Sequence, residues 1–204
     1  MSYALDKLYQ DACTAQAQST EARRIRTRVR DARSETTGAA QRWPFELLQN
    51  VHDAGPRDGQ QHVNLSFAWD GTTLDFRHDG SPFRLQEVAA LLSGGSSKEF
   101  ESDETTGRFG TGFMVTHALA CCIDITIAIH AEGQYEVAEI GLDRQGDEEA
   151  ILANIRASHE AMKAAVPRES LEGLPTASLR YRVDRPEAVA EGVESLRRTL
   201  PYLF

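Results

Sequence analysis

Glu46, Asn50 and Asp53 carry oxygen atoms that can do chemistry, and their spacing places all three on one side of a helix. At about 100° per residue, the three side chains fall within an arc of about 60°. An asparagine oxygen can bind Mg²⁺ beside phosphate groups, and a glutamate one turn earlier can accept a proton from an attacking water. The same pattern is typical of a surface helix that turns its polar side to solvent. The spacing therefore predicts either a metal and water site or an ordinary surface.

A second motif, RHDGSPF at residues 77–83, ends a predicted strand with an acid and a glycine. An Asp-Gly pair alone indicates only a turn. An ionised Asp79 buried near a purine can also accept a hydrogen bond from an exocyclic amine, a contact worth roughly 1.5–3 kcal/mol. The motif is therefore a candidate for base recognition.

A third motif, TGRFGTGF at residues 106–113, places three glycines ahead of the apolar stretch MVTHALA. Glycines let backbone N–H groups approach a phosphate closely, and the N-terminus of a helix adds about half a positive charge. The motif lacks the GK[ST] of a Walker loop, and a loop rather than a strand leads into it, unlike a Rossmann turn. It predicts an anion-binding loop of another kind.

ELLQNVHDA, HDGSPF and GRFGTGF, in this order, resemble the N, G1 and G2 boxes of the GHKL ATPases. This superfamily joins gyrase B, the ninety-kilodalton heat-shock chaperone, histidine kinases and MutL. GRFGTGF looks like the chaperone branch, and HDGSPF with the later TASLRYRV looks most like sacsin-type ATPase domains. The resemblance covers about residues 41 to 183. It implies a Bergerat-fold domain that binds ATP with Mg²⁺ and hydrolyses it slowly to ADP and phosphate.

The resemblance also implies roles for individual residues. Glu46 matches the general base, Asn50 the Mg²⁺ ligand, and Asp53 a polar residue that lines the pocket. The phosphates are expected against the third box, which comprises Gly107, Arg108, Phe109, Gly110, Thr111, Gly112 and Phe113. Lys98 either reaches a phosphate or stays solvated.

The base contact involves His78, Asp79, Gly80 and Thr176. Thr176 resembles a strand threonine that supports the adenine contact, and Gly80 the first glycine of the family's DxGxG motif. Asp79 is the expected adenine reader, but alignment on Gly80 puts His78 in the acid position. Pro82 replaces the second glycine and removes one N–H donor. The adenine reader is thus one of two adjacent residues.

The elements that must position these residues follow from periodicity. Helices are predicted over residues 4–33 (one or two), from about Pro44 to Ala54, over 85–92 and 148–165, and from Pro186. A buried helix is predicted over 112–120, and strands over 63–69, 73–78, 123–131, 134–142 and 178–183. Because the strands come in hairpins, the pattern favours an α+β two-layer sandwich over a doubly wound parallel sheet. The resemblance adds a mixed, mostly antiparallel sheet with helices on one face.

The 204 residues predict a single domain with a helical extension at 1–40. The resemblance implies an ATP lid at 93–106. A helix at 186–204 ends in an apolar cluster, which predicts downstream domains of a larger protein. Those domains and a second copy in a homodimer are the expected protein partners. An alternative function is a nucleotide-gated switch with negligible hydrolysis, in bacterial defence or DNA transactions. A histidine kinase is disfavoured, because no phosphoacceptor helix precedes the boxes and the form GxGLG is absent.

The composition narrows partners and location. A formal net charge of -9 argues against a protein that coats nucleic acid. The arginine-rich run EARRIRTRVRDAR indicates either a local nucleic-acid contact, which is the less favoured reading, or a solvated or partner-docking helix. Three cysteines without a disulfide or metal spacing favour the reducing cytoplasm. No apolar stretch approaches the roughly 20 residues that a bilayer requires, so no membrane contact is expected.

Overall fold

Six strands form one sheet in the order β1-β2-β6-β3-β4-β5. The structure is a computed structural model that describes residues 3–34, 38–94, 112–131 and 133–200. The strands are β1 (Leu65–Trp69), β2 (Thr73–His78), β3 (Cys122–Ala131), β4 (Gln134–Asp143), β5 (Val166–Arg168) and β6 (Ala177–Arg182). All five pairs of neighbouring strands are antiparallel, and one isolated parallel bridge joins Phe83 to Ile129.

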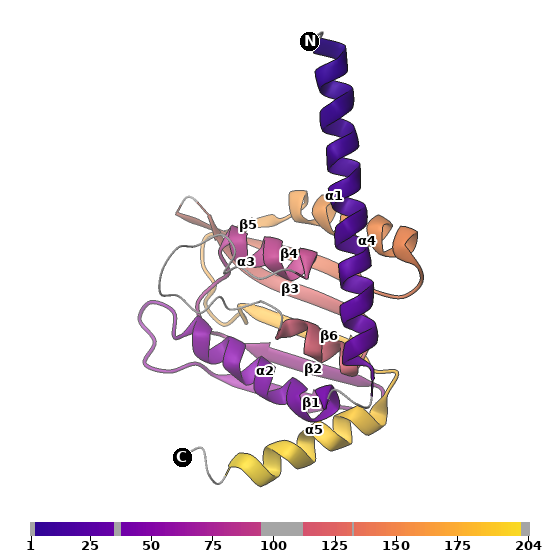
Figure 1. Cartoon of the computed structure of the whole chain (residues 1–204). Coiled ribbons are helices and arrows are strands. Elements are labelled where there is room, and N and C mark those ends of the chain that lie inside the picture. The colour runs from indigo at the N-terminus through magenta and orange to yellow at the C-terminus, as the bar shows by residue number, and fades with distance from the viewer. Residues whose placement is uncertain (1–2, 35–37, 95–111, 132, 201–204) are drawn as a thin grey trace.

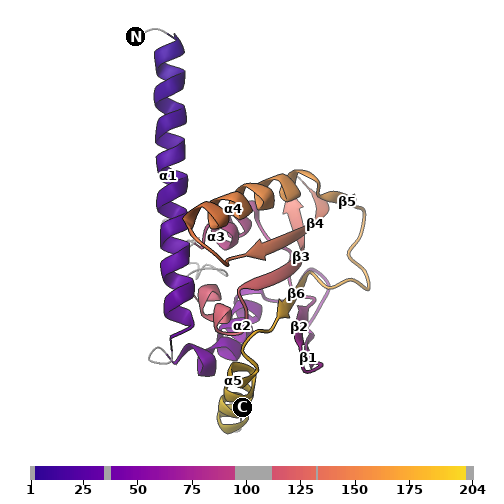
Figure 2. The same ribbon diagram turned by 90° about the vertical axis from the view of Figure 1, so that its right-hand side faces the viewer.

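The helices lie mainly on one face of this sheet (Figures 1 and 2). They are α1 (Tyr3–Ala32), α2 (Ala39–Ala54), α3 (Leu85–Ser93), the short 3-10 helix η3 (Phe113–Ala118), α4 (Glu148–Lys163) and α5 (Pro186–Thr199). Helix α4 packs on β4, α1 packs on α4 and η3, and α2 packs between η3 and α5. The N-terminal half of α1 extends past the rest of the molecule (Figure 2). The predicted α+β sandwich is confirmed.

The core lies between the helices and the inner face of the sheet. Alternate residues of each long strand point inward, for example Leu74 and Phe76 in β2, and Ile123 and Ile125 in β3, all at most 2% exposed. The outer face is polar, and ion pairs such as Arg180–Asp75 at 2.8 Å cross it between neighbouring strands. One face thus supplies the hydrophobic stabilisation, and the helices over it position the candidate site.

Two details of the sequence prediction were wrong. Helix α2 begins at Ala39 rather than at Pro44, because Gly38 adopts a left-handed φ of 64° that starts the helix earlier. Pro44 therefore lies inside the helix, where it donates no hydrogen bond to the carbonyl of residue 40. Strand β5 was missed, since three exposed residues after a long helix carry almost no periodic signal.

Helix α5 approaches α2 closely enough that Gly192 has no room for a side chain. A methyl group at Gly192 would overlap the indole of Trp43, which is 2% exposed and donates a hydrogen bond to the Ala188 carbonyl at 2.9 Å. We expect Gly192→Ala to lower the free energy of unfolding by about 1–3 kcal/mol, because overpacking displaces the indole. Urea unfolding measures this, with the exposed Glu191→Ala as the control. A variant at least as stable as the wild type would contradict the packing.

His117 in η3 is fully buried, and its Nδ1 donates to the Ala120 carbonyl at 3.0 Å. Burial lowers the pKa of His117 from 6.5 to about 4. The unfolded chain therefore binds a proton between pH 6.5 and 4 that the folded chain does not bind. Stability should fall by roughly 3 kcal/mol as the pH drops through this window, and no further below it. Urea unfolding of the wild type and His117→Gln at pH 7 and pH 4.5 tests this. Equal pH dependence in both proteins would contradict it.

No helix in the described part of the chain combines the length and the apolar composition that crossing a membrane requires.

Candidate functional site

Asn50 lies on the polar side of α2 but is not at the surface. Leu47 and Val51, its neighbours on the helix, are in the core, and Asn50 itself is only 7% exposed. Its Nδ2 atom is buried and has no hydrogen-bond partner among the described residues. An unpaired buried amide costs roughly 1–3 kcal/mol. Such a group indicates a ligand or solvent contact that the protein alone does not supply.

Glu46 lies one turn before Asn50, against Gly112, the residue that precedes η3. A methyl group at Gly112 would overlap the Glu46 carboxylate, so a larger residue there would displace this carboxylate from its position. The Glu46 side chain is 21% exposed and accepts a hydrogen bond from Arg42 Nη2 at 2.8 Å. The structure therefore brings together two predicted site residues that are far apart in the sequence.

Asp53, one turn after Asn50, is already engaged by its neighbours. Its carboxylate accepts a hydrogen bond from Gln49 Nε2 at 2.7 Å, and its side chain is 9% exposed. His52 Nδ1 lies 3.5 Å from the same oxygen. Asp53 thus shares the polar side of α2 with Glu46 and Asn50, as predicted, although Gln49 takes up part of its hydrogen-bonding capacity.

The turn after β2 packs against the C-terminal end of α2. Ser81 N donates to the Gly55 carbonyl at 2.9 Å, and a methyl group at Gly80 would lie 2.9 Å from that same oxygen. Gly55 itself has a φ of 64°, which ends the helix and turns the chain. The second predicted motif therefore meets the helix of the first one.

His78 and Thr176 form a buried polar pair beside this turn. His78 is 3% exposed and Thr176 is fully buried. The Thr176 hydroxyl donates to the His78 carbonyl at 3.2 Å, and its oxygen lies 3.4 Å from His78 Nδ1. Nδ1 also accepts the Gly80 N–H at 3.2 Å, which leaves the proton of the neutral ring on Nε2. Of the two adjacent candidates, Thr176 thus contacts His78.

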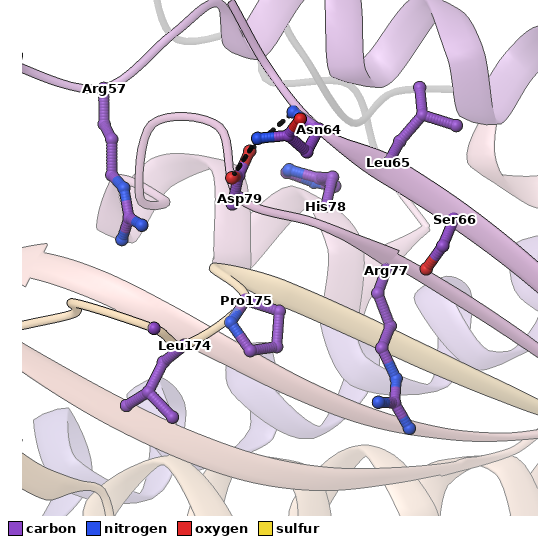
Figure 3. Close-up of a pocket in the computed structure, with 10 residues that line it drawn as sticks. Arg57, Asn64, Leu65, Ser66, Arg77, His78, Asp79, Leu174 and Pro175 are labelled. Atoms are coloured by element: carbon purple, nitrogen blue, oxygen red, sulfur yellow. Dashed lines mark hydrogen bonds between the residues drawn. The ribbon is translucent and has the colours of Figure 1, made fainter. Parts of the chain in front are cut away.

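Asp79 is bound by another residue, as Figure 3 shows. Its two carboxylate oxygens accept hydrogen bonds from the backbone and side chain of Asn64, at 2.7 and 2.8 Å. Partial burial alone would raise the pKa of Asp79. The Asn64 hydrogen bonds and the positive charge of Arg57 outweigh that effect and lower the pKa. Sequence reasoning missed Asn64, whose position opposite Asp79 depends on the pairing of β1 with β2.

A cavity of about 340 Å³ lies next to this Asp79–Asn64 pair. Arg57, Arg77, Leu174 and Pro175 surround it (Figure 3). Arg57 donates to the Leu171 carbonyl at 2.8 Å, which fixes one wall of the cavity. Asp79 therefore holds the end of the β1–β2 hairpin together through Asn64, and it also lines this cavity.

Several predicted residues lie outside the described residues. They are Lys98, Gly107, Arg108, Phe109, Gly110 and Thr111, together with residues 95–106 of the predicted lid. At the edges of this segment, Gly94 accepts a hydrogen bond from Arg28 of α1 and Phe113 is 2% exposed in the core. Phe113 is thus a packing residue at the start of η3.

The described His, Cys, Asp and Glu side chains form no protein-only metal site. No group of three His, Cys, Asp or Glu side chains in the described ranges is arranged to hold an ion. The oxygen of Asn50 suits Mg²⁺ bound together with phosphates, because that ion usually keeps only one or two protein ligands. The Nδ2 of Asn50, unpaired among the described residues, can donate to a phosphate oxygen, while its Oδ1 can hold Mg²⁺. No family model matches this chain, and neither does any curated protein sequence.

Proposed function

We propose that this chain is a GHKL-type ATPase domain that binds ATP with Mg²⁺ and hydrolyses it slowly to ADP and phosphate. The order of the three motifs in the sequence supports this proposal. The observation that carries it is the buried Nδ2 of Asn50, which finds no partner in the described part of the chain, one turn after a glutamate that touches the third motif at Gly112. A surface helix would leave Asn50 in water, with its amide satisfied.

In this proposal the residues of α2 have different roles. Asn50 holds Mg²⁺ through its amide oxygen, and the ion offsets the charge of the phosphates. Glu46 accepts the proton of the attacking water, and Arg42 at 2.8 Å fixes the position of its carboxylate. Gly112 leaves the space in which the third motif meets that carboxylate.

Titration with a nonhydrolysable ATP analogue, with and without Mg²⁺, tests the binding, and release of inorganic phosphate tests the turnover. We expect the affinity to rise with Mg²⁺ and the turnover to be slow. A chain that binds neither ATP nor ADP would contradict the proposal.

We further propose that His78, rather than Asp79, contacts the base. His78 is buried beside Thr176, whereas both oxygens of Asp79 are engaged by Asn64. His78→Ala is therefore expected to lower the affinity for ATP and for ADP alike by about 3–10-fold, because one hydrogen bond is lost. Asp79→Ala should mainly lower the free energy of unfolding. Calorimetry measures the nucleotide affinity of both variants, and urea unfolding measures their stability. If Asp79→Ala loses affinity and His78→Ala loses mainly stability, Asp79 is the base reader.

A second candidate is a nucleotide-gated switch with negligible hydrolysis. The ion pair between Arg42 and Glu46 favours it, since a carboxylate oxygen that is engaged by a guanidinium is less available to contact an attacking water. Nucleotide binding without phosphate release, in the wild type and in Arg42→Gln alike, would favour the switch over the enzyme.

The location that fits this function is the cytoplasm, which supplies ATP and keeps thiols reduced. Cys13, Cys121 and Cys122 are all free. Fractionation of cells that produce the protein tests this location, and recovery in an oxidising compartment would contradict it.

A further inference from the structure

A cavity of about 590 Å³ lies between α1 and the end of the sheet where β6 finishes and β3 begins. The residues that matter on its walls are Arg23, Arg26, Arg30, Arg144, Glu148 and Asp184. The candidate nucleotide site is at the other end of β6, where Ala177 pairs with His78. Six residues of strand separate the two places by about 20 Å. The cavity is therefore a separate feature of the molecule.

Positive charge dominates this cavity, although the chain as a whole carries a net charge of -9. Four guanidinium groups face two carboxylates. Both carboxylates already have partners, since Asp184 binds Arg33 at 2.9 Å and Glu148 binds Arg23 at 3.2 Å. Arg26 forms no ion pair with any described residue, and the pair of Arg30 with Asp31 is long and exposed, at 3.6 Å. The cavity therefore retains positive charge.

Arg144 adds a buried charge behind the cavity. It is 3% exposed and donates to the Leu92 carbonyl at 2.6 Å and to Asn154 Oδ1 at 3.4 Å, both neutral acceptors. Burial lowers the pKa of Arg144 to about 10, so the group stays charged at neutral pH. Glu21 and Asp143 are the acids that face it, and neither is in ion-pair contact. A buried cation without a paired anion raises the positive potential at the wall that it lines.

The arginines of α1 are held in place by the opposite side of the helix. Ile25 and Val29 pack with Met114 and the α4 isoleucines in a buried cluster. This fixes Arg23, Arg26 and Arg30, which are three and four residues apart, on one helix face over a span of about 10 Å. Planar guanidinium groups bind phosphate oxygens through pairs of N–H donors. The spacing of these three arginines therefore suits a ligand with several phosphates better than a single small anion.

We propose that this cavity binds a ligand that carries two or more phosphate groups, with Arg26 and Arg30 donating hydrogen bonds to them. Its volume lies within the roughly 300–1,000 Å³ of small-molecule sites. Two sources share this chemistry: a small polyphosphorylated molecule that enters the cavity, and a single-stranded nucleic acid whose backbone follows α1. The cavity's concave shape favours the small molecule.

Calorimetric titration with tripolyphosphate at low salt and without Mg²⁺ tests the proposal in the whole chain. The double variant Arg26→Gln with Arg30→Gln should bind roughly tenfold more weakly or worse. The matched control is Arg197→Gln with Arg198→Gln, which removes the same charge from an exposed helix; the Arg30 and Arg198 side chains are equally exposed, at 77%. Asn50→Ala should keep this binding, which separates the cavity from the proposed nucleotide site.

Short single-stranded DNA in the same assay distinguishes the two sources. Tighter binding of tripolyphosphate than of DNA, lost in the α1 variant only, supports a small ligand. If DNA binds more tightly than tripolyphosphate and also depends on Arg26 and Arg30, the phosphate site is supported and its ligand is a nucleic acid. The affinity for DNA should then fall steeply as the salt concentration rises. Absence of binding to either probe, or equal losses in the α1 variant and the control, would overturn the proposal.

Discussion

Glu46→Ala is expected to lower the rate of phosphate release by roughly 10²–10⁴-fold while it leaves the affinity for ATP nearly unchanged. A general base acts on the attacking water in the transition state and contributes little to ground-state binding. The variant should fold, because the side chain is 21% exposed and the Arg42 that it releases is 58% exposed. The measurement is single-turnover phosphate release beside an ATP titration of the same sample.

Two further variants make this result specific. Glu46→Gln retains a hydrogen-bonding group of nearly the same shape but cannot accept the proton, so it should be as slow as Glu46→Ala. Glu160→Ala removes one exposed glutamate from α4 and should behave like the wild type. If Glu46→Ala loses affinity and rate in equal proportion, the residue binds the nucleotide and is not the base.

The second large effect concerns Asn50. Asn50→Ala should remove the gain in ATP affinity that Mg²⁺ provides, because the amide oxygen is the proposed protein ligand of the ion. The affinity for ATP in the presence of Mg²⁺ should therefore fall by roughly 10–100-fold. Its Nδ2 makes no hydrogen bond to any residue that the structure describes. The substitution should therefore change the free energy of unfolding by less than about 1 kcal/mol, unlike the loss of a satisfied buried group.

Mg²⁺ titrations at fixed ATP and urea unfolding of the same variant measure these two quantities. Gln49→Ala, one position earlier on α2, serves as the control, since it removes an amide that binds only Asp53 in the described part of the chain. Asn50 would be a structural residue if the variant unfolded several kcal/mol more easily and kept its Mg²⁺ dependence.

Most elements were predictable because their signal is local. The alternation of Leu74 and Phe76 predicted β2, and the same alternation places His78 on their face and Asp79 opposite. That argument, extended by two residues, would have assigned His78 to the buried side from the sequence alone. The start of α2 was missed because the left-handed Gly38 outweighed the preference of Pro44 for a first turn.

The remaining features depend on contacts between distant segments. The unpaired state of Asn50 and the contact of Gly112 with Glu46 require the packing of η3 on α2, which no local pattern encodes. The same is true of the hydrogen bonds from Asn64 to Asp79, which follow from strand register. The candidate site was therefore predictable in its residue types, while its connections were visible only in the fold.

The central position of β6 has a consequence for the synthesis of the protein. This strand pairs with β2 on one side and β3 on the other, and Thr176 just before it contacts His78 across 98 positions of the chain. The hairpins β1–β2 and β3–β4 leave the ribosome first, and the edges of β2 and β3 that later pair with β6 are then uncovered. Pairing across such long separations is slow, and uncovered edges attract other strands. A nascent chain halted before residue 177 therefore holds two hairpins without the strand that joins them, and the uncovered edges of β2 and β3 are open to pairing with other chains.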